Sequence, residues 1–553
     1  MPDKSSKSIG DIVYRPIEFV SDALERKLGI VSVVIISLSA MLGSGLFVLP
    51  ALAMLDLGGP GIWLAYVIAG LVVLPGALSK SELATAMPTS GGDYIYIERT
   101  YGPLFGTLAG LGLWASFLLK AAFALIGFKA YLWVFEELIG ISVNVEIAAL
   151  ILLVAIVLIN ISGVKKIKKV QTPIVVTSVT FLVIICIWAM LTMELDWNRP
   201  ISEEAFGGGW KSVAGTAAFV FVSFAGVTKI AAIAEEIKQP SKNIPSGILI
   251  SLFISTLLYA GIAYIMMAAV EPSGYIHDNH AREDPIYVFA NAVGGKYVGM
   301  IAALLAVVTM TSMALAGIMA ASRYPFAMAR DNLLPEALEN VHPKFETPHL
   351  AIIGTGLAMA AAILFLPVHD VAKLASGFQI MIFVIINSCV IVLRRASSSH
   401  SWYKPEWISP LYPFVQLLGI IGGSVLIYLM GGKAILGAAA CCVLGLITYY
   451  LYGKSRADPM LTPWRVVRKE FTDPEQHNRE KRWLVFHTCC DKNQPGNMTL
   501  NEFFHSMEIL APHLGRFHLR NLFHEIDDNH DGVINIDEFL EAFDEELLKP
   551  VDD

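Results

Sequence analysis

Long apolar segments alternate with short polar ones over most of the chain. A helix of about 20 apolar residues, at 1.5 Å rise per residue, crosses the roughly 30 Å hydrocarbon core of a bilayer. Windows of that length predict twelve transmembrane helices, at residues 30–55, 60–85, 103–136, 145–162, 172–193, 212–234, 245–270, 294–321, 349–366, 371–393, 411–430 and 434–452. The pattern therefore predicts an all-α membrane protein with a transmembrane domain at residues 30–452.

The first predicted span is interrupted near its middle. It contains ISLSAMLGSGLFVLP, in which Gly43, Ser44 and Gly45 weaken the helix. Irregular backbone inside a bilayer is tolerated where it is buried or lines a cavity, because unpaired amides and carbonyls are costly in lipid. In secondary transporters such breaks form the substrate site. Small residues can also serve only to let helices pack closely, so this interruption alone leaves both interpretations open.

The sixth predicted span carries a second interruption. It reads FVFVSFAGVTKIAAIAEE, with Ala225 and Gly226 at its middle, and it is the first element of a second group of five helices. Weakened helices at matching places of two five-helix groups are typical of an inverted repeat. The second interruption therefore favours a substrate site over simple helix packing.

Lys and Arg are concentrated in alternate loops. If the N-terminus is cytoplasmic, the inner segments hold most of them, including KKIKK at residues 165–169, and the outer loops hold only a scatter such as Arg199, Arg282 and Lys433. Cytoplasmic loops carry an excess of Lys and Arg. Both termini, including the segment at residues 1–29, are therefore expected in the cytoplasm of a plasma- or inner-membrane protein. KKIKK is short for a nucleic-acid surface, and no nucleic-acid partner is expected.

The composition agrees with a membrane protein, because 55% of the 553 residues are hydrophobic, 16% are charged, and the mean hydropathy is +0.59. Four of the six cysteines form two adjacent pairs, which rarely bridge, so no structural disulfide is expected. The sequence contains no nucleotide loop of the form GxxxxGKS or GxxxxGKT. An ATP-driven pump and an enzyme are therefore not indicated.

The composition changes sharply after about residue 453. A linker at residues 453–480 leads to residues 481–553, which hold fifteen Asp or Glu against six Lys or Arg. Within this segment DDNHDGVINIDE fits the EF-hand calcium loop at every defined position. The residues that would supply oxygen ligands to Ca²⁺ are Asp527, Asn529, Asp531, Val533 through its carbonyl, Asn535 and Glu538. Helical apolar patterns flank the loop, so we predict a calcium-binding EF-hand domain at residues 481–553; the alternative is a solvated acidic turn.

An imperfect loop lies upstream of this one. In chain order it is the first loop, and the loop at residues 527–538 is the second. DKNQPGNMTLNE, from Asp491 to Glu502, keeps its first and last acidic positions and its central glycine. Pro495 falls at position five and offers no side-chain oxygen, so this loop lacks one ligand and one charge. We predict that it is a structural partner of the loop at residues 527–538 and binds calcium weakly or not at all.

Five motifs occur in order along the transmembrane domain. They are GSGLF at residues 43–47, SELATAMPTSGGDYIYIERTYGP at 81–103, FAG at 224–226, AEEIKQPSKNIP at 234–245 and ASRYPFAMARDNLLPEALENVHPKFETP at 321–348. With these motifs the chain resembles the amino acid, polyamine and organocation (APC) transporter superfamily over about residues 28–452. The resemblance implies a LeuT-like fold, in which a five-plus-five inverted repeat is followed by two further helices. A C-terminal EF-hand pair is not part of the usual family plan.

The resemblance also implies a binding site for the backbone of an amino acid or related amine. Amides of the first break would face the substrate carboxylate, and carbonyls of both breaks would face its amino group. The residues that this carries over are Met41, Gly43, Ser44, Gly45, Phe224, Ala225, Gly226 and Thr228. Thr228 is a departure, because many relatives have an acidic residue at that position.

The coupling ion, Na⁺ or H⁺, is left open by the sequence. In several proton-coupled relatives span five carries a lysine, and here the aligned residue is Ser178. Lysines inside membrane spans are functional candidates by default, because they are costly there. The candidates for holding a coupling cation or its place are Ser178, Lys229, Lys120, Thr309, Thr311 and Ser312. As structural alternatives, the hydroxyls bond to their own helices and the lysines pair with carbonyls or a carboxylate.

These observations predict a secondary transporter, a symporter or exchanger of amino acids or related amines, that works by alternating access and is regulated by calcium. The alternative function is a calcium-responsive membrane receptor that keeps the transporter fold and moves no substrate. The expected partners are the small-molecule substrate and the lipid bilayer. The sequence indicates no oligomeric state.

Overall fold

The structure is a computed structural model of the whole chain. It describes residues 28–87, 92–140, 144–162, 167–227, 230, 234, 237–277, 280–345, 347–396, 403–457, 462–472, 482, 485–486, 489–490, 496–510 and 516–544. These residues form two compact units. The larger unit takes its described residues from 14–390 and 405–459, and the smaller unit takes them from 391–404 and 460–553.

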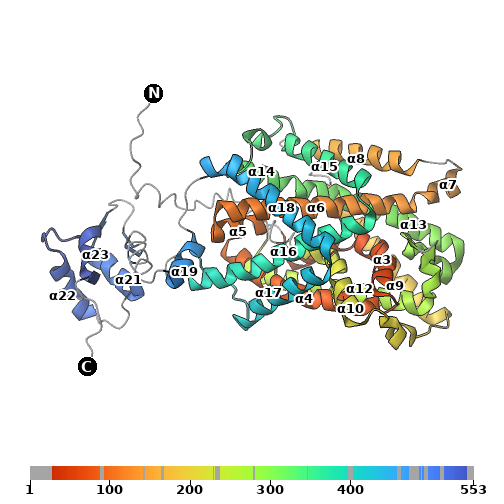
Figure 1. Cartoon of the computed structure of the whole chain (residues 1–553), viewed down its shortest axis with the longest axis horizontal. Coiled ribbons are helices and arrows are strands. Elements are labelled where there is room, and N and C mark those ends of the chain that lie inside the picture. The colour runs from red at the N-terminus through yellow and green to blue at the C-terminus, as the bar shows by residue number, and fades with distance from the viewer. Residues whose placement is uncertain are drawn as a thin grey trace. The chain divides into compact units, whose positions relative to one another are not determined.

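Helices occupy all twelve predicted membrane ranges (Figure 1). They are α1 (Ile30–Met41), α2 (Ser44–Phe47), α3 (Leu49–Leu57), α4 (Ile62–Ala86), α6 (Pro103–Tyr131), α7 (Trp133–Ile139), α8 (Val145–Ile161), α9 (Ile167–Thr192), α10 (Gly209–Val220), η5 (Phe221–Val227), α12 (Pro240–Ala269), α13 (Pro285–Ala321), α15 (His349–Phe365), α16 (Val368–Arg395), α17 (Phe414–Leu429) and α18 (Gly432–Leu451). Over the described residues, eight helices are long and apolar enough to cross a bilayer, and shorter apolar helices lie in the other four ranges. The prediction of a helical membrane protein is confirmed at that level.

Short elements connect these helices. They are α5 (Asp93–Tyr101), η3 (Arg199–Ile201), η4 (Glu203–Phe206), η7 (Pro272–Tyr275), α14 (Arg323–Arg330), η8 (Glu336–Glu339) and η9 (Gly453–Ser455). The strands β1 (Ile276–His277) and β2 (His280–Ala281) pair antiparallel between α12 and α13. This small hairpin is a departure from the predicted all-α domain.

Both predicted interruptions are present in the backbone. Span one bends after Met41, where α1 ends, and continues as α2 and α3. Span six changes at Phe221 from an α-helix to the 3-10 helix η5, which runs through Val227. The two irregular segments face each other, because α1 packs against η5.

The longest helices form the frame around these segments. α6 packs along α13, and α4 packs along α12 and α10 (Figure 1). Large aromatic side chains fill the space between them, and Tyr66, Tyr259 and Phe224 are fully buried there. Apolar side chains on the outer faces of α17 and α18 are exposed, as a lipid-facing surface requires.

The smaller unit contains α19 (Pro463–Thr472), α21 (Leu500–Leu510), α22 (Arg516–Ile526) and α23 (Ile536–Asp544). The strands β3 (Asn497–Met498) and β4 (Ile534–Asn535) pair antiparallel. Phe503, Phe523 and Phe539 lie in the buried core that α21, α22 and α23 share. An apolar face on each of these short helices thus accounts for the packing of this unit.

Candidate functional site

Tyrosine hydroxyls bind the backbone carbonyls that the break in span one sets free. The last carbonyls of a helix have no partner within it. The Met41 carbonyl accepts a hydrogen bond from Tyr259 Oη (2.7 Å), and the Gly45 carbonyl accepts one from Tyr66 Oη (2.8 Å). Tyr259 Oη also lies 3.3 Å from the Ser223 carbonyl of η5. One hydroxyl therefore contacts both interrupted spans.

The two breaks pack directly on each other. A Cβ added to Gly226 would lie 2.5 Å from the Ala40 carbonyl carbon and 2.5 Å from the Met41 nitrogen. A Cβ added to Gly45 would collide with the Ser223 side chain. A side chain at Gly226 would collide with the span-one backbone, and one at Gly45 would collide with the Ser223 side chain, so both places favour glycine.

Aromatic rings support this contact. The rings of Tyr66 and Tyr259 stack with their centroids 5.3 Å apart. Phe224, which the family resemblance places over the substrate, packs edge-on against Tyr259 at 5.3 Å. Phe224 therefore contacts the tyrosine that binds carbonyls of both spans, and its place over a substrate stays a prediction.

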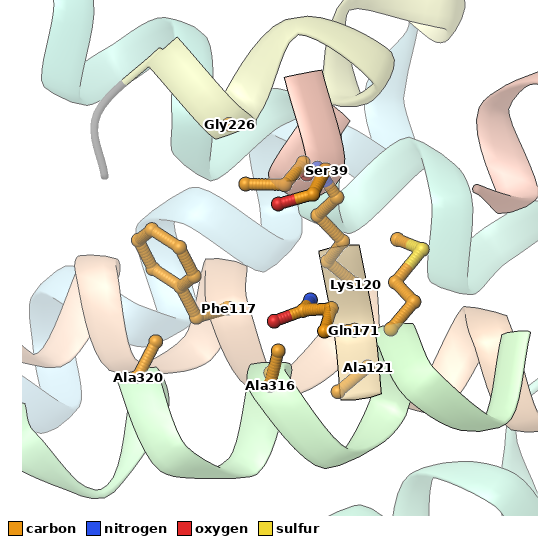
Figure 2. Close-up of a pocket in the computed structure, with 11 residues that line it drawn as sticks. Ser39, Phe117, Lys120, Ala121, Gln171, Gly226, Ala316 and Ala320 are labelled. Atoms are coloured by element: carbon orange, nitrogen blue, oxygen red, sulfur yellow. Dashed lines mark hydrogen bonds between the residues drawn. The ribbon is translucent and has the colours of Figure 1, made fainter. Parts of the chain in front are cut away.

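A small pocket of about 30 Å³ adjoins both breaks (Figure 2). Ser39 at the end of α1 and Gly226 of η5 line it on one side. Phe117 and Lys120 of α6 and Gln171 of α9 contribute the larger side chains, and small residues of α13 complete the wall. A mostly apolar lining with a few polar groups is usual for a small-molecule site, but a pocket of this volume holds water rather than an amino acid, so a substrate would have to widen it.

Lys120 links the pocket to the break in span one. Its side chain extends from α6 toward the end of α1 (Figure 2), and Nζ donates a hydrogen bond to the Ala40 carbonyl (2.9 Å). The residue is only 7% exposed. Lys120 thus makes the carbonyl contact expected of a structural role and also lines the pocket, as a functional role requires. The other lysine candidate, Lys229, and its neighbour Thr228 lie outside the described residues.

Three of the four hydroxyl candidates form hydrogen bonds within the protein. Ser178 Oγ and Thr309 Oγ1 lie 2.6 Å apart and are both buried. Ser178 and Thr311 also donate to the carbonyls four residues earlier in their own helices, at 2.9 and 2.8 Å. Ser312 is buried on α13. These bonds agree with the structural alternative for Ser178 and Thr311.

At the centre of the first break, the backbone N–H of Ser44 donates to Met313 Sδ at 3.4 Å. The Ser44 hydroxyl lies 3.6 Å from the same sulfur. A thioether is a weak hydrogen-bond acceptor. This amide, which the resemblance assigns to the substrate carboxylate, is therefore held only weakly by the protein.

Comparisons with known proteins identify the family of this chain. The sequence model of the family described as Amino acid permease matches residues 28–447. The chain belongs to the amino acid permease family.

Several curated relatives match this permease over most of their length. A branched-chain amino acid permease of Bacillus subtilis is 29% identical over 79% of this chain and 94% of the relative. A methylthioribose transporter of the same species is 26% identical over 79% of this chain and 95% of the relative. Cationic amino acid transporter 9 of Arabidopsis thaliana is 27% identical over 73% of this chain and 72% of the relative. The relatives are permeases and transporters, so the expectation that this protein is not an enzyme is confirmed.

Residues 460–553 of this permease lie beyond the family match and contain two loops joined by paired strands. β3 and β4 place Met498 opposite Ile534, each at position eight of its predicted loop. Gly532, at position six of the second loop, has a φ of +86°, in the left-handed region that favours glycine. Helix, loop, short strand and helix follow one another as an EF-hand requires.

Side-chain oxygens of the second loop accept backbone hydrogen bonds. Asp527 accepts from the N–H groups of Asp531 (3.2 Å) and Gly532 (2.9 Å). Glu538 accepts from the N–H of Asn535 (2.9 Å). These bonds curl the loop around its own acidic side chains.

The first loop repeats one of these bonds. The N–H of Thr499 donates to Glu502 at 2.7 Å, and these residues occupy positions nine and twelve, like Asn535 and Glu538. Residues 491–495, with the proline at position five, lie outside the described residues. The weak or absent calcium binding expected of this loop stays a prediction.

The donor set of the second loop fits calcium in kind, because it consists of carboxylate, amide and backbone oxygens. Its carboxylates are not gathered at one point, since within the described residues no group of three Asp, Glu, His or Cys side chains is placed to hold a metal. Asn529 Nδ2 donates to Glu538 Oε1 at 3.1 Å instead. The predicted ligands therefore lie in one loop, and the Glu538 carboxylate accepts hydrogen bonds from Asn529 and Asn535 of that loop.

Sequence reasoning missed the tyrosines and the pocket residues from other helices. Besides Tyr66 and Tyr259, Tyr131 Oη donates to the Phe47 carbonyl at 2.6 Å, just beyond the break. The available signal was a tyrosine inside an apolar span, since a buried phenol needs a hydrogen-bond partner. Gln171 carried a similar signal as an amide close to a predicted membrane span.

Proposed function

We propose that this permease is a secondary transporter of amino acids or related amines that works by alternating access across twelve spans. The observation that carries the proposal is the direct contact of two interrupted spans beside a pocket that adjoins both. Irregular backbone at membrane depth is costly unless it is buried in the protein or lines a cavity. The names of the relatives support an amino acid as the substrate class.

The proposed substrate site is formed by the span-one residues around Gly43–Gly45 and the span-six residues Phe224–Gly226, with Thr228 following. A carboxylate is a stronger acceptor than the Met313 thioether that now accepts from the Ser44 N–H. A bound substrate carboxylate would therefore replace the Met313 sulfur as the acceptor, and only a weak hydrogen bond would be lost.

Counterflow in proteoliposomes tests this function. Vesicles loaded with one unlabelled amino acid at a time should take up the same labelled amino acid faster than empty vesicles. The substrate itself is found by a thermal-shift screen of the twenty amino acids in sodium, in potassium and at two pH values. Ligand binding without any counterflow would favour the alternative, a receptor on a transporter fold.

We further propose that the Lys120 ammonium takes the place of a bound coupling cation. Its ammonium occupies the end of α1, where a bound cation would otherwise meet the Ala40 carbonyl. Ser178 and Thr309 are engaged with each other, which makes a sodium site between them less favourable. Uptake should then be independent of Na⁺, and Lys120→Gln should lower the uptake rate. Strict dependence on Na⁺ would contradict this assignment.

For regulation, the proposal is that Ca²⁺ binds the loop at residues 527–538 and alters transport. The fit of the donor set and the EF-hand pairing of β3 with β4 support it. Both termini, and with them this loop, would face the cytoplasm. Calorimetry on the full-length protein should detect calcium binding that Glu538→Gln weakens, while Glu541→Gln, an exposed change on α23 outside the loop, serves as the charge control.

A further inference from the structure

Basic and aromatic side chains gather where the last span ends. α18 ends at Leu451, between Tyr450 and Tyr452. Lys454 Nζ lies 5.3 Å from the centre of the Tyr450 ring. The Arg456 guanidinium lies 4.0 Å from the centre of the Tyr452 ring. Both basic side chains are exposed. Because tyrosines are enriched at the level of the lipid headgroups, these contacts indicate that two positive charges lie at the membrane surface.

The helix α19 continues this basic segment. Its residues Arg465, Arg468 and Lys469 are three and four positions apart, so they belong to one face of the helix. The Arg465 and Arg468 side chains are exposed. Residues 453–469 together hold five Lys or Arg against one Asp or Glu. A positively charged segment thus runs from the end of the last span into α19.

The apolar face of α19 is buried at its centre. Val467 is only 5% exposed, whereas Trp464, one turn earlier, is 37% exposed. Trp464 neighbours Arg468 on the helix surface, at the border between the apolar and the basic face. Helices that lie in a membrane interface combine a basic face with such an aromatic residue. Because Val467 is already buried, the contact that α19 offers to lipid is mainly electrostatic.

The chain connection keeps the start of α19 within reach of the membrane. η9 ends at Ser455 and α19 begins at Pro463, so seven residues, 456–462, join them. At no more than about 3.5 Å per residue, this connection spans at most roughly 28 Å. The attraction of an anionic surface falls off within a Debye length, about 8 Å at physiological salt. The basic face of α19 can therefore reach the headgroups without any change in the spans.

We propose that Lys454, Arg456 and the basic face of α19 bind anionic phospholipid headgroups at the membrane surface beside the last span. A lipid such as phosphatidylserine supplies the negative charge that complements this segment. The acidic residues of the segment 481–553 are a competing occupant, and lipid is favoured because two of the basic residues lie at the end of α18 itself. Binding at this surface requires only the membrane setting, so a protein without counterflow would still show it.

Hydrogen exchange of the full-length protein in lipid nanodiscs, followed by mass spectrometry, tests this surface. Discs of phosphatidylcholine are compared with discs that also contain phosphatidylserine. Amide exchange in α19 should be about fivefold slower or more with phosphatidylserine, since one basic residue near such a surface already strengthens binding about fivefold. Exchange in α15 should stay unchanged. High salt should remove the difference, and inorganic phosphate added to phosphatidylcholine discs should not reproduce it.

A double variant identifies the side chains that bind the lipid. Arg465→Gln with Arg468→Gln should remove most of the difference between the two lipids, whereas Lys211→Gln with Lys296→Gln, exposed basic residues of α10 and α13, should keep it. Equal exchange of α19 in both lipids, a difference that the Arg465 and Arg468 variant keeps, or equal slowing by inorganic phosphate would each overturn the proposal. Salt-sensitive exchange that is the same in both lipids would overturn it in favour of a contact with the acidic segment 481–553.

Discussion

Removing one hydroxyl from Tyr259 tests whether the contact between the two breaks depends on hydrogen bonds to freed carbonyls. In Tyr259→Phe the ring stays in place between Tyr66 and Phe224, and only the oxygen is lost. The Met41 carbonyl then loses its 2.7 Å hydrogen bond, and the Ser223 carbonyl loses a longer contact at 3.3 Å. The residue is fully buried, so water does not replace the donor.

The expected cost follows from two limits. A buried polar group left unpaired costs about 1–3 kcal/mol, whereas hydrogen bonds between membrane helices average only about 0.6 kcal/mol, because the unfolded chain in the membrane also finds partners. The Met41 carbonyl lies at a helix end and has no intrahelical partner. We therefore expect Tyr259→Phe to lower the free energy of unfolding by about 1.5 kcal/mol, near the upper value measured in membranes.

A titration with SDS in mixed micelles measures this free energy of unfolding. Tyr264→Phe is the matched control, because Tyr264 Oη also donates to a carbonyl, that of Trp197, at 2.7 Å, but in an exposed position. Its loss should cost about 0.5 kcal/mol or less, since water takes over the hydrogen bond. If Tyr259→Phe is no more destabilising than Tyr264→Phe, the tyrosine does not hold the breaks in the way described.

Three further changes test other parts of the argument. Gly226→Ala should lower the free energy of unfolding by about 2 kcal/mol, because the new Cβ meets the span-one backbone, including Met41. Gly261→Ala, with open space around it, is the control. Equal effects of the two changes would contradict the close packing at Gly226. Burial raises the pKa of the Glu98 carboxyl to about 7. This carboxyl stabilises the folded state below its unfolded pKa of about 4.5, and that contribution is lost as the pH rises toward 7. The wild type should thus lose about 2 kcal/mol more than Glu98→Gln between pH 5 and pH 8, as measured by unfolding at each pH, and parallel profiles would refute it. Calcium inside proteoliposomes should change the uptake rate of wild type but not of Glu538→Gln, and a flat response in both would remove calcium regulation.

Particular residues show which parts of the site could be predicted from the sequence. Gly43, Ser44 and Gly45 marked the first break because small residues in an apolar span are a local signal, and the backbone bends after Met41. Ala225 and Gly226 marked the second in the same way, although the change to 3-10 helix begins earlier, at Phe221. The partners of the freed carbonyls were not predictable, because Tyr66, Tyr131 and Tyr259 come from three other helices. Their spacing in the chain carries no information about which carbonyl each one meets.

By itself the sequence determined the membrane setting, the places where two spans are interrupted, and the ligand pattern of the C-terminal loop. Each of these depends on residues close together in the chain: apolar runs of bilayer length, clusters of small residues, and oxygen donors at alternate positions. Only the tertiary structure decided that Lys120 meets the Ala40 carbonyl, that Ser178 is paired with Thr309, and that α16 holds Asp56. Those contacts join residues up to about three hundred positions apart, and helix packing rather than local pattern brings them within hydrogen-bond distance.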